Sequence, residues 1–319
     1  MNSVTVVGSF NVDHVWRCEA LPAAGATIAG TYSTGPGGKG FNQAVAAVRA
    51  GAPTRFVCAL GADAGGALAR ELALADGIEL LAADSSEPTG TAGIYVDARG
   101  RNSIVIGAGA NVALDLAHVE QQQPALTRAR VVLVQLESPQ DAVLRALQLA
   151  REAGVTTLLN PAPANAPSSI ALLGLADVIT PNETEFAALL ARHVGERIEP
   201  DDVASLDGAR LHALCRQLLP NGSVVVTLGA VGASVSHPEG RQRGDALAHY
   251  RIAAEPAQAI DTTGAGDAFN GALAASLARS PEAPFQQHVR FANLFAARST
   301  ERAGAALAMP RLAELDVTV

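Results

Sequence analysis

Short β-branched runs alternate along this chain with longer stretches rich in Ala and Leu, and this alternation constrains the fold most. The runs are apolar at consecutive positions, which is typical of strands covered by helices on both faces. Six strands are predicted, at Val4–Val7, Arg55–Ala59, Val131–Gln135, Thr156–Leu159, Val178–Thr180 and Val224–Leu228. Seven helices are predicted, at Asn42–Ala50, Gly65–Ala75, Gln140–Ala153, Glu183–Arg192, Leu206–Leu219, Asp267–Arg279 and Gln287–Arg302. This βαβ series predicts an α/β fold, a doubly wound, mostly parallel sheet with helices on both faces.

Two segments interrupt the alternation, at about 12–36 and 89–106. Both have the pattern of strands joined by turns, without a helix, and Asp97–Gly100 has the composition of a hairpin turn. No linker or internal repeat divides the sequence. We therefore expect one domain over residues 1–319, with a small second sheet built from these two insertions.

Composition excludes several classes of protein. The chain has 319 residues, 49% of them hydrophobic and 17% charged, so it is neither disordered nor collagen-like. A net charge of −8 and an aromatic content of 4% argue against nucleic acid or an anionic membrane as a partner. No apolar run reaches the ~18 residues of a membrane span, and the first residues lack the pattern of a signal peptide. Three widely spaced cysteines, Cys18, Cys58 and Cys215, predict reduced thiols in a cytoplasmic protein.

A first glycine-rich loop runs from Gly35 to Gly40 and precedes a predicted helix. By its letters it contains GxGxxG, but the acidic residue that a dinucleotide site needs about 20 positions later is missing. A Walker A loop is excluded because Lys39 is followed by Gly40 rather than Ser or Thr. The alternative is a plain tight turn. Lys39 and the amide Asn42 beside three closely spaced glycines favour a ligand site.

A second glycine-rich loop lies within Asp261–Gly271. Gly264, Ala265 and Gly266 lead into a helix, so their N–H groups can converge on an anion at the positive end of the helix dipole. Asp267 stands at the same helix start, where the alternative is an N-cap. A carboxylate beside bare amides suits the removal of a proton from an alcohol while a phosphoryl group is transferred to it.

Seven segments occur in an order that resembles the ribokinase (PfkB-type) carbohydrate kinases nearly from end to end. They are Gly8–Asp13, Gly37–Ala44, Gln135–Pro139, Asn160–Pro163, Thr180–Glu185, Thr227–Gly229 and Asp261–Gly271. The resemblance implies a ribokinase-like α/β body, a small β-sheet lid that often also joins two protomers as a homodimer, and MgATP-dependent phosphorylation of a sugar hydroxyl. It implies Asp267 as general base and Gly264, Ala265 and Gly266 as the anion hole.

The resemblance also implies a sugar site. Its polar contacts are Asn11, Asp13, Gly38, Lys39, Asn42 and Glu137, and its apolar walls are Ala92, Ile94 and Ile106. Fixed carboxylates and amides suit a small polyol, and this set favours ribose as the acceptor, giving ribose 5-phosphate. Turn chemistry is the alternative for Asn11 and Asp13, and a surface carboxylate is the alternative for Glu137.

For the nucleotide, the resemblance implies Asn182 and Glu185 near the phosphates and the Mg²⁺ water shell, with Asn293 near the adenine. Thr227, Gly229 and Gly232 match the stretch that flanks ATP in the family. Capping of a helix is the alternative for Asn182 and Glu185, and simple solvation is the alternative for Asn293.

A K⁺ site formed mostly by carbonyl oxygens is implied as well. Its residues are Asp261, Thr263, Ser299, Arg302 and Gly304. The chain departs from the family pattern in two places, with Ala308 in place of a serine near this cation and Phe41 in place of the usual alanine. The Phe41 side chain either packs into the core or narrows the sugar pocket, so the acceptor could also be another pentose, a ketohexose or a nucleoside. A non-catalytic sugar- or nucleotide-binding regulator is the alternative from another class.

Overall fold

The computed structural model describes residues 2–315; Met1 and residues 316–319, at the ends of the predicted domain, lie outside the described residues. One large sheet has nine strands in the order β13-β12-β11-β10-β9-β8-β1-β4-β5. They are β1 Val4–Val7, β4 Thr54–Gly61, β5 Glu79–Ser85, β8 Val131–Val134, β9 Thr156–Leu159, β10 Val178–Ile179, β11 Ser223–Thr227, β12 Ala233–Ser236 and β13 His249–Ile252. The seven strands from β11 to β5 in this order run parallel, and β12 runs antiparallel to both of its neighbours, β11 and β13, which confirms the predicted mostly parallel sheet.

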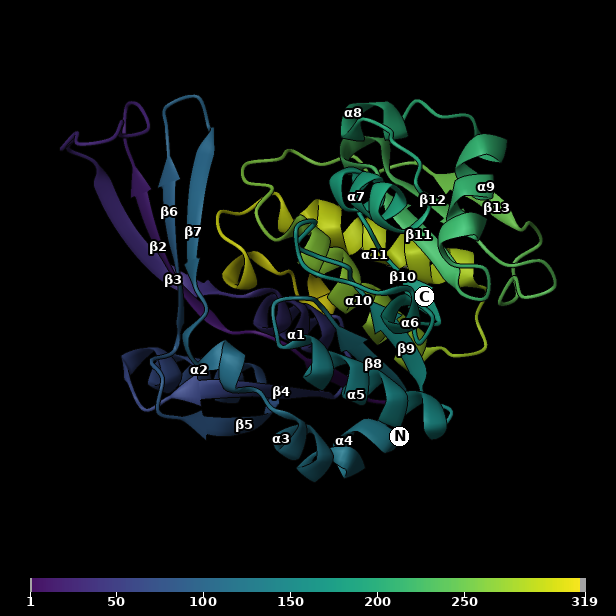
Figure 1. The fold of residues 1–319 in the computed structure, drawn as a ribbon, viewed down its shortest axis with the longest axis horizontal. Helices are drawn as coiled ribbons and strands as arrows, with labels where there is room; N and C mark the ends of the chain where they lie inside the picture. The colour runs from purple at the N-terminus through teal and green to yellow at the C-terminus, as the bar shows by residue number, and fades with distance from the viewer. Residues whose placement is uncertain (1, 316–319) are drawn as a thin grey trace.

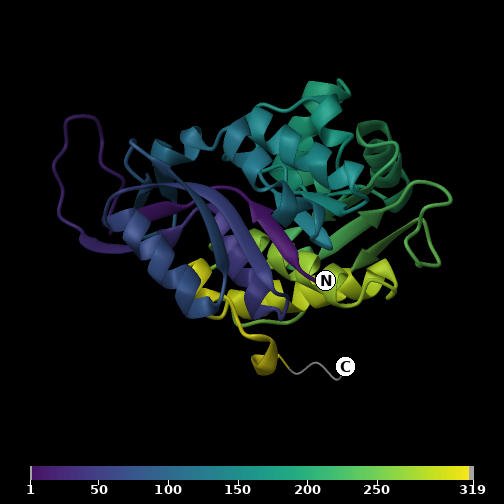
Figure 2. The same ribbon diagram turned by 90° about the horizontal axis from the view of Figure 1, so that it is seen from below.

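Helices cover both faces of this sheet (Figure 2). On one face lie α1 Lys39–Arg49, α2 Ala64–Asp76, α10 Ala265–Arg279 and α11 Phe285–Ser299. On the other lie α3 Leu116–Gln121, α4 Gln123–Thr127, α5 Gln140–Glu152, α6 Ile170–Leu173, α7 Glu183–His193, α8 Pro200–Val203 and α9 Gly208–Leu218. Strand β1 contributes valines to both cores, because Val4 and Val6 enter one core and Val7 enters the other. Among residues 2–315, no helix combines the length and the apolar character needed to cross a membrane.

The predicted elements are all present, with shifted ends. Helix α1 begins at Lys39 rather than Asn42, because Gly38 turns the chain with a φ of 86° and α1 starts directly after it. Strands β5, β12 and β13 were not predicted, and neither were the short helices α3, α4, α6 and α8. Each of these three strands lies at an edge of the sheet or next to one. The edge strands β5 and β13 are only partly buried, so the apolar pattern in their sequences is weaker.

A second sheet of four strands rises at one end of the molecule (Figure 1, left). It contains β2 Asn11–Arg17, β3 Thr31–Gly37, β6 Gly90–Val96 and β7 Asn102–Gly107, in the order β3-β2-β6-β7. Its strands come from the two segments that interrupt the sequence pattern. The predicted turn at 97–100 joins β6 to β7, with the Gly100 N–H donating to the Asp97 carbonyl at 2.9 Å.

The chain adds strands first on one side of β1 and then on the other, and this change of side locates the candidate site. From β1 the chain passes to β4 on one side and later returns to β8 on the other side. In open parallel sheets, ligands bind at such a switch point, outside the carboxyl ends of the strands. Gly8 follows β1 there and packs on the start of α1, where a Cβ on Gly40 would lie 2.6 Å from the Gly8 carbonyl carbon.

Candidate active site

Asp267 lies in the first turn of α10 and is buried, with 7% of its surface exposed. Asn42 Nδ2 donates to its Oδ2 at 2.9 Å, and Gln43 Nε2 donates to its Oδ1 at 2.8 Å. The N-cap of α10 is Gly264 and no side chain caps the helix, so the N-cap alternative for Asp267 is wrong. Packing of α1 against α10 therefore sets the orientation of this carboxylate.

Bare main-chain N–H groups lie just before Asp267. Within residues 2–315, the N–H groups of Gly264 and Gly266 donate to no other residue. The Ala265 N–H is partly engaged, since it donates to the Thr262 carbonyl at 3.2 Å. A Cβ added to Gly266 would meet no atom within 4 Å, so open space adjoins this turn. Two of the three predicted donors are thus free to bind an anion at a helix start.

Opposed charges surround Asp267. Burial raises the pKa of its carboxyl above the ordinary range, and the negative charge of Glu137 adds to this effect. The positive charge of Lys39 and the two amide donors act in the other direction. Burial alone would lower the pKa of Lys39, but the carboxylates of Asp267, Glu137 and Glu185 raise it. Lys39 is therefore a cation shared by several carboxylates around one space.

Glu137 ties the loop after β8 to the start of α1. Its Oε2 accepts hydrogen bonds from Ser9 Oγ at 2.6 Å and from the Lys39 main-chain N–H at 3.0 Å. The residue is half-buried, so a free surface carboxylate is the wrong description. Ser9 was not predicted, although it lies in the conspicuous stretch that follows β1.

Asn11 and Asp13 stand on β2 rather than in a turn, so the turn alternative is wrong for both. Asn111 Nδ2 donates to Asn11 Oδ1 at 2.8 Å and also to the Phe10 carbonyl. Asp13 sits over Gly37, where a Cβ would lie 2.2 Å from its Oδ1. Burial, then the charges of Glu137 and Asp267, raise the pKa of Asp13 to about 6. The three carboxylates therefore interact electrostatically.

The predicted apolar walls share one face of the small sheet. Ala92 pairs with Asp13 across β2 and β6, and Ile106 pairs with Ala92 across β6 and β7. Ile94 lies two positions beyond Ala92 and so points to the same side. Ala92 is buried, whereas Ile106 is 51% exposed.

The predicted nucleotide residues lie in two groups. Asn182 and Glu185 form a reciprocal capping box on α7. The Glu185 N–H donates to Asn182 Oδ1 at 2.8 Å and the Asn182 N–H donates to Glu185 Oε2 at 2.9 Å, so both residues cap the helix. Thr227 lies beside them through a bridge with Asn182, followed by Gly229 and Gly232 at positive φ. Asn293 is buried and donates to the Ala253 carbonyl at 3.4 Å, so the solvated alternative is wrong. Their role toward a nucleotide stays a prediction.

Three of the five predicted cation residues are joined by hydrogen bonds of Asp261. Its Oδ1 accepts from the Thr263 N–H at 2.9 Å and its Oδ2 from the Gly304 N–H at 3.0 Å. Burial favours a higher pKa for Asp261, but these hydrogen bonds outweigh it and keep the pKa low. The Ser299 hydroxyl instead donates to the Ala296 carbonyl, and Arg302 pairs with Glu314.

The two departures from the family pattern are both buried. The Phe41 ring packs 5.0 Å from the Phe10 ring, in the core, so it does not narrow the sugar site. Ala308 is buried in the short segment η3 Ala306–Ala308 and offers no hydroxyl there.

Five buried polar residues near Asp267 were missed as site residues. They are Gln43, Gln135, Asn160, Thr180 and Asn270. A signal was available for three of them, because Gln135, Asn160 and Thr180 each follow directly after an apolar strand.

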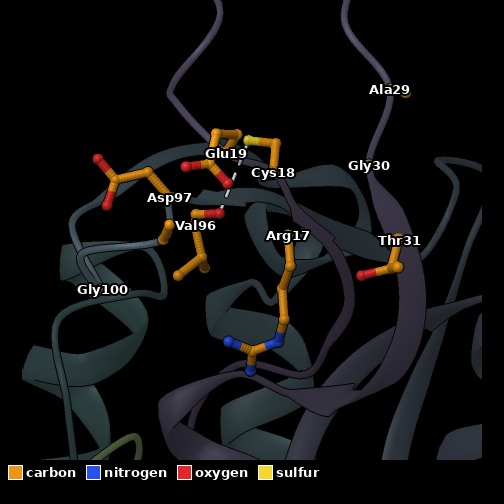
Figure 3. Close-up of a pocket in the computed structure, with 10 residues that line it drawn as sticks. Arg17, Cys18, Glu19, Ala29, Gly30, Thr31, Val96, Asp97 and Gly100 are labelled. Carbon is orange, nitrogen blue, oxygen red and sulfur yellow. Dashed lines mark hydrogen bonds between the residues drawn. The ribbon is translucent and has the colours of Figure 1, made fainter.

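A cavity of about 700 Å³ lies elsewhere, at the far ends of β2, β3 and β6 (Figure 3). Arg17, Cys18, Thr31 and Asp97 are among its lining residues. None of the predicted site residues lines it. The candidate site is instead the group of side chains around Asp267 at the switch point of the large sheet.

The sequence matches the pfkB family of carbohydrate kinases over residues 1–312. The chain belongs to this family. A ribokinase of Haemophilus influenzae is 37% identical, over 97% of this chain and 95% of its own length. A ribokinase structure from Giardia lamblia has a TM-score of 0.85 at 29% identity, and covers 98% of this chain and 96% of its own. The structure of an Arabidopsis thaliana ribokinase with ribose and ATP has a TM-score of 0.79 at 31% identity, with coverage of 98% and 96%.

These similarities confirm two predictions. The fold is the ribokinase-like α/β fold, and the chain is a carbohydrate kinase of the ribokinase type, as the resemblance implied. The family membership does not by itself assign a role to any side chain.

Proposed function

We propose that this chain transfers the terminal phosphoryl group of ATP to a hydroxyl of ribose, giving ribose 5-phosphate. One observation carries the proposal: a buried carboxylate, Asp267, lies at a helix start next to two main-chain N–H groups that donate to no residue within 2–315, and the charge of Lys39 acts on it. Similarity to a ribokinase over nearly its whole length supports ribose as the acceptor. The Arabidopsis structure with ribose and ATP supports both substrates.

In the proposed reaction, Asp267 accepts the proton of the attacking hydroxyl as its oxygen bonds to phosphorus and the bond to the leaving ADP breaks. A raised pKa makes Asp267 a better proton acceptor than an exposed aspartate, and Lys39 helps to keep it ionised beforehand. The N–H groups of Gly264 and Gly266 stabilise negative charge on the moving phosphoryl oxygens. Little covalent chemistry is asked of the protein, so positioning and charge do most of the work.

The sugar would be held by Asn11, Asp13, Asn42 and Glu137. Asn42 Oδ1 is buried and has no hydrogen-bond partner among residues 2–315, so it is an acceptor ready for a sugar hydroxyl. Asp13 and Glu137 supply further acceptors for neighbouring hydroxyls. A site of fixed polar groups rejects an acceptor that lacks one hydroxyl, because a buried partner is then left unpaired.

For the nucleotide we propose Asn182, Glu185, Thr227, Gly229 and Gly232, with Asn293 near the base. In the capping box, the Asn182 and Glu185 side chains each already accept a hydrogen bond from a main-chain N–H. This suits water-mediated contact with Mg²⁺ better than direct ligation. Mg²⁺ would supply charge neutralisation on the phosphates. For K⁺ we propose Asp261, Thr263, Ser299, Arg302 and Gly304, and the anionic Asp261 fits a cation there.

We also propose that the chain is one domain whose second sheet acts as a lid over the sugar and as the surface between two copies. The face opposite Asp13 carries an aromatic group of His14, Trp16, Tyr32 and Tyr95. Tyr32 is 53% exposed and Val105 is 67% exposed. Exposed apolar groups of this kind mark interaction surfaces. Sedimentation of a monomer at micromolar concentration would contradict the dimer.

The decisive experiment replaces the proposed base. Asp267→Asn should lower kcat by at least ~10²-fold, a typical contribution of a general base, while ribose still binds in a calorimeter. Turnover close to that of the unaltered protein would refute the role of Asp267. A non-catalytic regulator is the competing function, and it predicts no turnover with any sugar before the substitution.

The acceptor and the cation are tested with the unaltered protein. A coupled assay over a panel of sugars should rank ribose first in kcat/KM, and a higher value for fructose or adenosine would reject ribose. Rates should be higher in K⁺ than in tetramethylammonium at equal ionic strength. Equal rates would remove K⁺ from the proposal.

A further inference from the structure

Asp267 is connected to a row of buried amide side chains that the proposed reaction does not use directly. Gln135 Nε2 donates to Gln43 Oε1 at 2.6 Å. Gln43 Nε2 donates both to Asp267 Oδ1 at 2.8 Å and to Asn160 Oδ1 at 3.0 Å. Asn160 Nδ2 donates in turn to the Thr180 carbonyl at 3.1 Å. Gln43 and Gln135 are almost completely buried, so water does not compete for these bonds.

The direction of these hydrogen bonds is set at one end by the main chain. The Thr180 carbonyl can only accept, so Asn160 must present its NH₂ group to it and its oxygen to Gln43. Gln43 must then turn its NH₂ group toward Asn160 and Asp267, and its oxygen toward Gln135. A carboxylate at position 267 receives a donor without any rearrangement. The opposite amide orientation would place an oxygen against the Asp267 carboxylate.

We propose that Gln43 is a positioning residue for phosphoryl transfer, held by Asn160 and Gln135 so that its NH₂ group fixes one oxygen of Asp267 and leaves the carboxylate ionised and aimed at the acceptor hydroxyl. This inference rests on the proposed role of Asp267 as general base. Gln43 touches neither sugar nor nucleotide in that proposal; it acts through Asp267. Asn42, its neighbour in α1, holds the other oxygen of the carboxylate and also belongs to the proposed sugar site.

The proposal predicts a change in the pH dependence of turnover. The charged groups that influence Asp267 are Lys39, which favours its ionised form, and the carboxylates of Asp13, Glu137 and Glu185, which disfavour it. Against three carboxylates, the donor from Gln43 lowers the pKa of Asp267. Without that donor the pKa of Asp267 rises, and the acid limb of kcat moves to higher pH.

The test compares Gln43→Met with the unaltered protein and with Gln217→Met. Gln217 lies exposed on α9, far from the site in sequence and on the opposite face of the sheet, so it controls for the same change in a helix. For Gln43→Met we expect the acid limb of kcat to shift upward by about one pH unit, since a hydrogen bond to a charged group is lost. We expect KM for the sugar to change by less than about threefold, because the residue does not contact the sugar.

A second variant keeps the inference testable if Gln43→Met does not fold. Gln135→Met removes only the bond that orients the Gln43 oxygen, so the shift should have the same direction and be smaller. An unchanged acid limb in a folded Gln43→Met protein, or in a folded Gln135→Met protein if Gln43→Met is unfolded, overturns the inference. If Asp267→Asn is inactive in the same assay, the proposed function survives that result. If Asp267→Asn is active, the proposed function itself fails.

Discussion

Gly271 lies where α10 crosses α1, and replacing it by alanine tests how closely the two halves of the site must approach. A Cβ at this position would lie 2.4 Å from Ala46 Cβ and 2.4 Å from the Gln43 carbonyl oxygen. Ordinary van der Waals contact begins at 3.4 Å, so the two helices must separate by about 1 Å. The atoms in the way belong to the backbone and to a buried methyl group, and neither can move aside alone.

Separating α1 from α10 would break a hydrogen bond of the candidate site. Gln43 is on α1 and Asp267 is on α10, so their 2.8 Å hydrogen bond would stretch to about 3.8 Å and be lost. Overpacking of this kind costs about 1–3 kcal/mol in the free energy of unfolding. A displacement near 1 Å in a catalytic group lowers kcat by up to about 10²-fold.

Urea unfolding and a coupled kinase assay measure the two effects on Gly271→Ala. Gly208→Ala is the control, because Gly208 begins α9 and a Cβ there would make only an ordinary 3.7 Å contact with His249. That change should leave kcat unaltered and stability equal or slightly higher. The reasoning is refuted if Gly271→Ala unfolds at the same urea concentration as the parent with the same kcat.

Two further predictions concern charged groups. Because Asp13 has a pKa of about 6, it is protonated at pH 5, and KM for ribose should rise as pH falls from 7 to 5. Asp13→Asn should flatten this dependence, and a slope that persists in the variant contradicts the assignment. Asp76 accepts bonds from Arg49 and Arg311, and Asp76→Ala should destabilise the fold by about 3 kcal/mol because it leaves the half-buried Arg49 guanidinium without its carboxylate partner. Asp84→Ala, at an exposed ion pair, should have little effect on urea unfolding; equal losses in the two variants would contradict the argument.

Much of the fold could be predicted from the local pattern of apolar residues. The runs at 4–7 and 131–134 are apolar at every or nearly every position, and only a strand covered on both faces requires this. Edge strands carried less information. Strand β13, with the sequence His-Tyr-Arg-Ile, has one buried residue in four, so its pattern does not differ from that of a loop.

Part of the candidate site could also be predicted from local sequence. Gly264, Gly266 and Asp267 lie within four positions of each other at one helix start, so their arrangement could be predicted from spacing. Gln43 could not be assigned in this way. Its side chain is an ordinary polar group in a helix until α10 is packed against it, and its partners are 117 and 224 positions away.

By itself, the sequence determined most of the elements and their order, the mostly parallel class of the sheet and the presence of a helix start with bare N–H groups. These follow from burial periodicity and backbone conformation, which depend on neighbours a few residues apart. Only the tertiary structure decided that Phe41 packs into the core and that Gln43 holds Asp267. The direction of a side chain and its hydrogen-bond partner depend on how distant helices pack, and no local pattern contains that information.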